Sequence, residues 1–308
     1  MTAAIRPSGA ALLLVLWAIT VISFAVLWMA NVVNLELETT VSDSAGLRAR
    51  QIAVSGVALG LHPQVKRDDT ELLNRDFGAG ERMQVRIRGE GARFNINRLL
   101  KDQDRITMLN LFTLWGLTAD EGNALIDKLT DWVDEDEFRT GFGGAERTEY
   151  EAVGITGAPA NRPFRSVPEM GRVLDMEKLA ALKPDWAESF TIFSDGLIDV
   201  NEAEADVLQA VTGATPEMVQ GILQQRRGSD GIEPSEDDLR FDDVGQVAGW
   251  LAGSTLPPEQ IMGRLTTESS VKRIDSRGMV GERSRQISVV AESGEGGEAV
   301  TYLLWEEK

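Results

Sequence analysis

The densest reactive chemistry in this 308-residue chain is a run of carboxylates near its middle. Asp127, Asp131 and Asp134 are spaced four and three residues apart, which places them along one face of a helix. Residues 135–137 add three acids at the expected end of that helix, where the helix dipole is unfavourable for anions. The next basic residue is Arg139, so these carboxylates repel one another unless a cation joins them.

A hard cation would offset this repulsion. Calcium prefers six to eight oxygen ligands at about 2.3 to 2.6 Å, and Glu146 and Glu149 supply further carboxylates after the glycine-containing loop at residues 141–144. The every-second-residue ligands and the terminal glutamate of an EF-hand are missing. A solvated acidic loop explains the same spacing equally well.

Paired carboxylates also suggest the acid and base of a glycosidase. Such a site needs a groove of aromatic side chains around the pair. Only four aromatic residues are nearby in the sequence, which is few for such a groove: Trp132, Phe138, Phe142 and Tyr150. We therefore rank this interpretation below calcium binding.

Composition removes several other kinds of site. The chain has no cysteine and one histidine, which disfavours disulfide scaffolds, zinc fingers and histidine-dependent triads. His62 precedes Pro63 at the expected end of a long helix, so we interpret it as a surface residue rather than a catalytic base. The 31 basic and 49 acidic residues give a net charge of −18, which argues against nucleic-acid binding.

Residues 10–30 are almost wholly apolar, and no charged residue lies between Arg6 and Glu36. About 20 helical residues cross a bilayer core, so the sequence predicts a transmembrane helix at residues 10–35. A cleaved secretory signal is the alternative, but its apolar region is usually shorter, about 7 to 15 residues. Arg6 favours a cytoplasmic N-terminus, with the chain after the helix on the opposite side of the membrane.

The helical pattern continues beyond the apolar segment and is expected to end near Gly60 and Pro63. A helix of about 50 residues is about 75 Å long. Its first half cannot be buried in its own globular domain, so it must lie in lipid or pack against similar helices.

Two-residue alternation marks strands on both sides of a helical region. Residues 82–88 alternate between apolar and polar, and a second strand at 92–96 completes an expected β-hairpin. Three further alternating runs follow near the C-terminus, at residues 271–279, 285–292 and 300–305. The sequence therefore predicts an α+β fold with one antiparallel sheet, interrupted by a helical insertion at about residues 98–265.

The insertion holds a weak repeat of two helix pairs, with turns at residues 116–118 and 213–215. Residues 199–227 resemble a helix-hairpin-helix unit, a fold that can bind DNA phosphates. Residues 199–250, however, carry twelve acidic and three basic side chains, which repel phosphates. We interpret the unit as a protein-packing fold.

Several motifs together resemble one known family, the general secretion pathway protein K family of minor pseudopilins from the type II secretion system. The start resembles the leader and hydrophobic helix of pilin-like proteins. The motifs are GARFNINRL at 91–99, LTDWVDEDE at 129–137, GAERTEY at 144–150, NRPFRSVPEM at 161–170 and DVNEAEADVL at 199–208. They occur in the family's order over essentially the whole chain.

The resemblance implies a domain organisation. It consists of a prepilin leader at residues 1–9, a transmembrane helix at 10–35, the helix continuation with a first hairpin at 36–97, an inserted all-α domain at 98–265, and pseudopilin strands at 266–308. The inserted domain would have two sterile-alpha-motif-like parts, at about 98–197 and 198–265. The prepilin peptidase would cut after Gly9, so that the mature chain begins at Ala10.

The resemblance also implies a non-enzymatic role at the tip of the pseudopilus. The partners would be minor pseudopilins I, J and H, the major pseudopilin G and the prepilin peptidase, with a single span in the inner membrane and the C-terminal domain in the periplasm. The fifth mature residue would be Leu14, where most pilin-like subunits carry glutamate to meet the subunit above. The alternative is a membrane-anchored periplasmic hydrolase or saccharide-binding protein.

The family binds calcium in the acidic segment, which makes five residues candidate ligands: Asp131, Asp134, Asp136, Glu146 and Glu149. Arg147 stands where relatives commonly have an acidic residue. Its positive charge counts against a second ion or a full coordination shell. We expect at least one structural calcium ion that clamps the loop.

Overall fold

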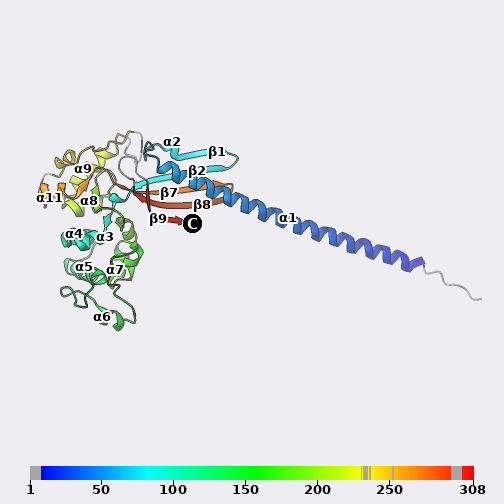
Figure 1. Cartoon of the computed structure of the whole chain (residues 1–308), viewed down its shortest axis with the longest axis horizontal. Coiled ribbons are helices and arrows are strands. Elements are labelled where there is room, and N and C mark those ends of the chain that lie inside the picture. The colour runs from blue at the N-terminus through cyan, green and yellow to red at the C-terminus, as the bar shows by residue number, and fades with distance from the viewer. Residues whose placement is uncertain (1–7, 230, 232–234, 236, 252, 293–299) are drawn as a thin grey trace, which may run out of the picture.

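The computed structural model of the chain describes residues 8–229, 231, 235, 237–251, 253–292 and 300–308. One long helix extends away from a body in which a β-sheet lies beside a domain of shorter helices (Figure 1). The sheet packs against the C-terminal part of the long helix (Figure 1). The N-terminal part of that helix extends past one end of the sheet, and the helical domain lies at the other end (Figure 1). The predicted mixture of helices with an antiparallel sheet is confirmed.

Helix α1 (Ser8–Gly60) ends where the glycine and proline pattern predicts. The large apolar side chains between Leu13 and Met29 are exposed, for example Trp17 at 74%. Within the described residues, we find no helix that is both long and apolar enough to cross a membrane, so the span predicted at 10–35 is not confirmed. Residues 1–7 of the predicted leader lie outside the described residues, and Gly9 and Ala10 fall in the first turn of α1.

The main sheet has five antiparallel strands in the order β1-β2-β7-β8-β9. Their bounds are Asn74–Gly78 for β1, Glu81–Gly89 for β2, Val271–Val280 for β7, Arg283–Glu292 for β8 and Thr301–Glu307 for β9. The three C-terminal strands are confirmed. The neighbours β2 and β7 come from the two sides of the helical region, as one interrupted sheet requires.

The hairpin predicted between residues 82–88 and 92–96 is wrong. The chain forms a 3-10 turn, η1 (Glu90–Ala92), and then a short strand, β3 (Phe94–Asn95), in a separate sheet. The hairpin partner of β2 is β1, which precedes it. Every residue of β1 is exposed, including Phe77, so no buried face gives this edge strand an alternating pattern in the sequence.

Helix α1 packs very closely on the sheet. Its buried face and the facing strand residues form one core that includes Ala53, Val57, Val85 and Ile274. Glycines allow the approach, because a Cβ at Gly278 would overlap the Ala49 carbonyl oxygen of α1. The helix backbone therefore lies directly against the strand backbone at this point.

Shorter helices fill the chain between β2 and β7. Their bounds are Ile96–Lys101 (α3), Arg105–Leu114 (α4), Ala119–Val133 (α5), Arg147–Ala152 (α6), Met176–Leu182 (α7), Ala205–Thr212 (α8), Pro216–Arg226 (α9), Gly245–Ala248 (α10) and Pro258–Met262 (α11). Helix α2 (Thr70–Leu73) precedes β1, and 3-10 turns lie at Val167–Arg172 (η2) and Trp186–Ser189 (η3). Strand β3 pairs with β4 (Phe190–Thr191), and β5 (Ile198–Asp199) pairs with β6 (Leu265–Thr266). We call residues 90–270 the helical domain; its core is separate from that under α1.

The two predicted helix pairs are present as α4–α5 and α8–α9. Thr118 caps α5 in a reciprocal capping box with Glu121. Thr215 caps α9, with Pro216 in its first turn. Gly213 ends α8 at a left-handed φ of 64°, where glycine is favoured.

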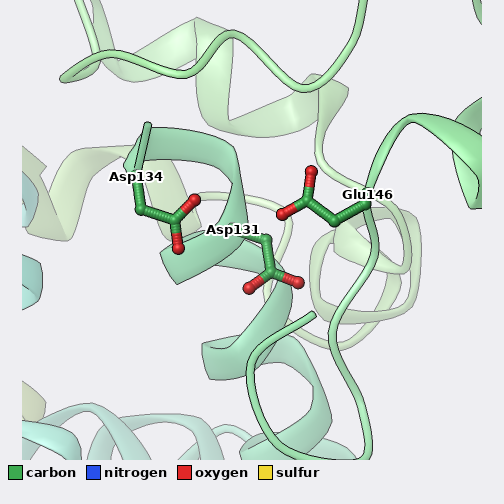
Figure 2. Close-up of side chains that lie close together, drawn as sticks. All are labelled: Asp131, Asp134 and Glu146. Atoms are coloured by element: carbon green, nitrogen blue, oxygen red, sulfur yellow. The ribbon is translucent and has the colours of Figure 1, made fainter. Parts of the chain in front are cut away.

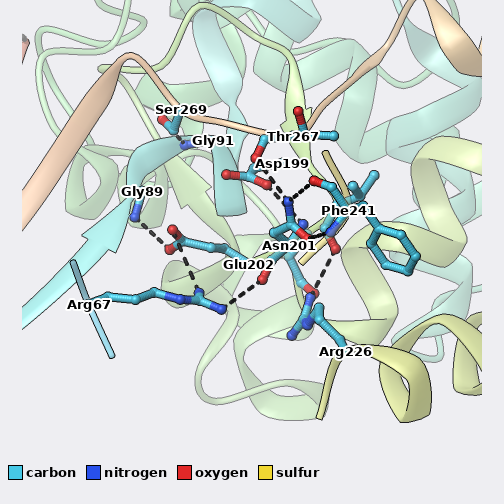
Figure 3. Close-up of polar contacts among 12 residues, drawn as sticks. Arg67, Gly89, Gly91, Asp199, Asn201, Glu202, Arg226, Phe241, Thr267 and Ser269 are labelled. Carbon is cyan, nitrogen blue, oxygen red and sulfur yellow. Dashed lines mark hydrogen bonds and ion pairs between the residues drawn. The ribbon is translucent and has the colours of Figure 1, made fainter. Parts of the chain in front are cut away.

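Polar contacts join the helical domain to β2 where the chain enters and leaves it (Figure 3). Glu202 accepts the Gly89 N–H at 2.7 Å and pairs with Arg67 at 3.6 Å. Asn201 is fully buried; its amide donates to Phe241 and Thr267 carbonyls at 2.9 Å each. The Asn201 side chain therefore joins the segments at Phe241 and Thr267 inside the helical domain.

We expect Gly278→Ala to destabilise the chain, because the new methyl would meet the α1 backbone, with 2.7 Å to Ala53 N, and a side-chain shift cannot relieve this overlap. Overpacking costs about 1 to 3 kcal/mol, so thermal unfolding should show a melting temperature several degrees lower. Gly249→Ala is the control, since nothing lies within 4 Å of its Cβ position and its φ is −64°. Equal melting temperatures for the two variants would contradict the close packing.

Candidate metal centre

The acidic segment predicted from the sequence folds around the end of α5. Asp131 lies on the last turn of α5, Asp134 is its C-cap residue, and Glu146 is the N-cap residue of α6. Figure 2 shows the three carboxylates gathered in one space, with the loop from α5 returning to bring Glu146 beside the helix end. Two helix ends and one loop therefore position the cluster.

One carboxylate oxygen from each of Asp131, Asp134 and Glu146 lies within 4.8 Å of the others. Asp131 is fully buried and Glu146 is 5% exposed. Four oxygens of the cluster are buried without a hydrogen-bond partner: Asp131 Oδ2, Asp134 Oδ1, Glu146 Oε1 and Glu146 Oε2. Because buried, unpaired carboxylates are costly, these oxygens fit a hard cation that would share them.

Burial and the neighbouring negative charges raise the pKa of two carboxyl groups in the cluster. Burial, and then the negative charge of Asp131, raise the pKa of Glu146 to about 7. Burial, and then Asp131, raise the pKa of Asp134 to about 6. Without a cation, the cluster therefore holds protons at pH values where ordinary carboxylates have lost them.

Two carboxylates of α5 also hold the loop in place, because they accept hydrogen bonds from its backbone N–H groups. Asp131 Oδ1 accepts the Thr140 N–H at 2.8 Å, and Oδ2 is left buried without a hydrogen-bond partner. Asp127 accepts the Gly143 N–H at 3.1 Å and pairs with Arg105 at 2.8 Å. Asp127 therefore anchors the loop, although its helical spacing groups it with Asp131 and Asp134.

The structure does not bring the other two candidate ligands, Asp136 and Glu149, into the cluster. Asp136 accepts the Phe138 N–H at 2.7 Å in the exposed part of the loop. Glu149 accepts the Glu146 N–H at 3.0 Å and pairs with Arg139 at 3.3 Å. Arg147 pairs with Glu137 at 3.2 Å, so its charge is balanced outside the three carboxylates.

Asn161 was missed as a candidate and adds a further oxygen next to the cluster. Its side chain and that of Glu146 line one cleft of about 270 Å³. The amide oxygen Oδ1 of Asn161 is buried without a partner, while its backbone N–H donates to the Trp132 carbonyl at 3.0 Å. The sequence shows only an asparagine suited to a turn, and its φ of 49° agrees with that role.

The nearby aromatic residues do not form a saccharide groove. Trp132 stacks on Phe164 with ring centroids 6.2 Å apart, and Tyr150 meets it edge-on at 5.6 Å. These rings are buried core residues, whereas Phe138 and Phe142 point into solvent. The aromatic side chains therefore support the fold around α5, and the glycosidase interpretation loses its main requirement.

We expect the metal-free chain to lose stability as the pH rises from about 4 to about 7. The pKa values of Asp134 and Glu146 are raised in the folded state from 3.8 and 4.5, so folding favours protonated groups. This contribution is complete below the unfolded values and is lost as the pH passes about 6 and about 7. Melting temperatures in excess chelator across this range would show the decline.

Two variants test the source of that slope. Glu146→Gln removes one titrating group and should flatten the decline, whereas Glu177→Gln, on the exposed side of α7, should leave it unchanged. A slope that is the same in both variants would show that Glu146 is not responsible.

Parts of the chain are similar to known proteins. Residues 92–184 match the model described as type II secretion system (T2SS), protein K. The chain is 28% identical over 167 residues to the Type II secretion system protein K of Pseudomonas aeruginosa; the match covers 51% of this chain and spans about half (48%) of the relative.

The fold is also similar to that of a chain in the crystal structure of the GspK-GspI-GspJ complex from the enterotoxigenic Escherichia coli Type 2 Secretion System. The TM-score is 0.60 at 18% identity, over 89% of this chain and 98% of that chain. This likeness shows a shared fold, and the matched family model and the curated relative make parts of the chain similar to protein K of the type II secretion system.

Proposed function

We propose that the chain is a minor pseudopilin of the type II secretion system, with an assembly role rather than an enzymatic one. The observation that carries the proposal is the family match at residues 92–184 inside a pseudopilin-like fold. The matched residues begin at the end of η1 and run through α7, within the helical domain between β2 and β7. The helical domain fits a subunit with nothing stacked above it, which supports a place at the pseudopilus tip.

The first half of α1 supports attachment to the inner membrane. Its large apolar side chains are exposed from Leu13 to Met29, and Leu14 is 72% exposed. Exposed apolar area on this scale requires lipid or partner helices as a cover. We propose a single span with the N-terminus in the cytoplasm and the later domains in the periplasm, and cleavage after Gly9 by the prepilin peptidase.

We propose minor pseudopilins I and J as direct partners, with H and the major pseudopilin G joining the same assembly. The support is that the similar chain comes from a crystal structure of a GspK-GspI-GspJ complex. In this assembly the chain would prime polymerisation of G beneath it. The two-part division of the helical domain, at about 98–197 and 198–265, belongs to the same proposal.

We also propose that the metal centre holds structural calcium. Asp131, Asp134 and Glu146 would supply the carboxylates, and Asn161 offers a neighbouring amide oxygen. The ion would join α5 to α6 by neutralising carboxylates that otherwise repel one another. Backbone and water oxygens would complete the shell, because calcium prefers more ligands than three carboxylates provide.

Calcium should raise the melting temperature of the full chain and give a measurable heat of binding. At a free concentration of about 100 times Kd, binding stabilises the folded state by about 2.7 kcal/mol. Asp131→Asn and Glu146→Gln should remove both effects. Asp136→Asn and Glu149→Gln should retain them, because the structure holds these two side chains outside the cluster. Wild-type protein with no heat and no shift would remove the calcium proposal.

Coexpression tests the assembly proposal. With the prepilin peptidase present, N-terminal sequencing should begin at Ala10, and a tagged chain should copurify with pseudopilins I and J. An unrelated membrane-anchored periplasmic protein with the same tag controls for nonspecific capture. An intact Met1 or a cut after Ala30, without copurification, would favour a different class of anchored protein.

A further inference from the structure

A large groove lies between the main sheet and the helical domain. Its volume is about 1820 Å³, and residues of β2, β7, β8 and β9 form its floor. Its wall comes from the residues at and just before η2, the segment around β4, the residues around α8, and the C-terminal end of α9. Figure 1 shows the sheet and the helical domain meeting where the chain passes between them. The groove is far along the chain from the metal centre and shares no residue with it.

The groove floor is one face of the sheet, and helix α1 covers the opposite face. The apolar strand residues point toward α1, which leaves polar residues on the floor. Met83, Val85 and Ile274 pack toward α1, so the residues that alternate with them face the groove. Arg86 and Arg277 belong to this alternate set on the neighbouring strands β2 and β7. The sheet therefore directs guanidinium groups away from α1 and into the groove.

The groove reverses the charge balance of the chain. The whole sequence has a net charge of −18, yet eleven basic and seven acidic residues line the groove. Neighbouring carboxylates neutralise some of these cations: Arg88 pairs with Asp275 at 2.7 Å, and Arg273 with Glu90 at 2.6 Å. The excess of basic residues is therefore concentrated in the remaining arginines.

Among the arginines that line the groove, four have no carboxylate partner within the described part of the chain. Arg86 lies on the floor, and Arg165 and Arg227 lie on the wall. Arg277 makes a 3.4 Å hydrogen bond to Ser284 Oγ, which carries no charge. Guanidinium groups form their strongest contacts with carboxylates, often through two parallel hydrogen bonds. A groove with unsatisfied guanidiniums on two sides suits a ligand whose carboxylates are distributed along its length.

We propose that this groove binds an extended, acidic segment of another polypeptide. Its carboxylates would pair with the arginines of floor and wall, and Phe193 and Leu304 offer apolar surface for side chains between them. A polypeptide fits better than a nucleic acid, because it can place carboxylates only where the arginines lie and apolar side chains against Phe193 and Leu304. A nucleic acid carries a phosphate at every nucleotide, so it would also bring negative charge against the acidic remainder of the chain. The proposal does not depend on the secretion role.

Fluorescence anisotropy with the full chain in a neutral detergent, at constant calcium, tests this groove. The probe is a fluorescein-labelled peptide of alternating glutamate and serine, which should bind and weaken as salt is raised. The floor variant Arg86→Glu with Arg277→Glu should weaken binding by about tenfold or more. The double wall variant, Arg165→Glu with Arg227→Glu, should also weaken binding by about tenfold or more. If the floor variant does not fold, the affinity of the wall variant tests the proposal.

Matched controls separate the groove from general charge. Lys101→Glu, on the exposed end of α3 outside the groove, should keep affinity within about twofold of wild type. Arg86→Lys with Arg277→Lys should retain most of the salt-dependent binding. The proposal is overturned if the floor and wall variants bind the peptide as wild type does. It is also overturned if an oligothymidylate or phosphatidylglycerol vesicles displace the peptide and bind more tightly.

Discussion

The antiparallel ladder between β2 and β7 is the constraint on which the rest of the molecule depends. It runs without a break from the Glu81–Val280 pair to the Gly89–Lys272 pair. Because these strands flank the helical domain, their pairing holds its entry and exit at one end of the sheet. The same ladder supplies the centre of the surface on which α1 packs. Glu202 and its contacts at Gly89 then fix the helical domain against this end.

The metal centre depends on a different balance, between backbone hydrogen bonds and carboxylate repulsion. Asp131 serves both sides, since Oδ1 accepts the Thr140 N–H of the loop while its carboxylate is also part of the cluster with Asp134 and Glu146. One oxygen of Asp131 therefore helps to shape the loop, while its other oxygen has no hydrogen-bond partner. A cation would remove the electrostatic cost without altering the contacts that shape the loop.

Sequence patterns predicted the parts of the fold in which residue types follow a regular pattern. Apolar and polar residue types alternate in β7 to β9, although β9 is exposed along most of its length, and the end of α1 carries its glycine and proline. Strand β1 has no buried face, and β3 has two residues, so neither leaves a periodic pattern. At the site, the spacing found Asp131 and Asp134 but could not separate them from Asp136, because the loop backbone decides which carboxylates converge. Asn161 is distant in sequence and reaches the cleft only through tertiary folding.

The two separate hydrophobic cores set an order for folding during synthesis. All residues of the helical-domain core lie between Phe94 and Leu265, so this core can form before β7 is made. The core under α1 needs Ile274, Ile287 and Val289, which the ribosome adds near the end. Domains generally fold as units as the chain emerges. A nascent chain that stops before β7 therefore has a complete helical domain, while the sheet-facing side of α1 still has no partner.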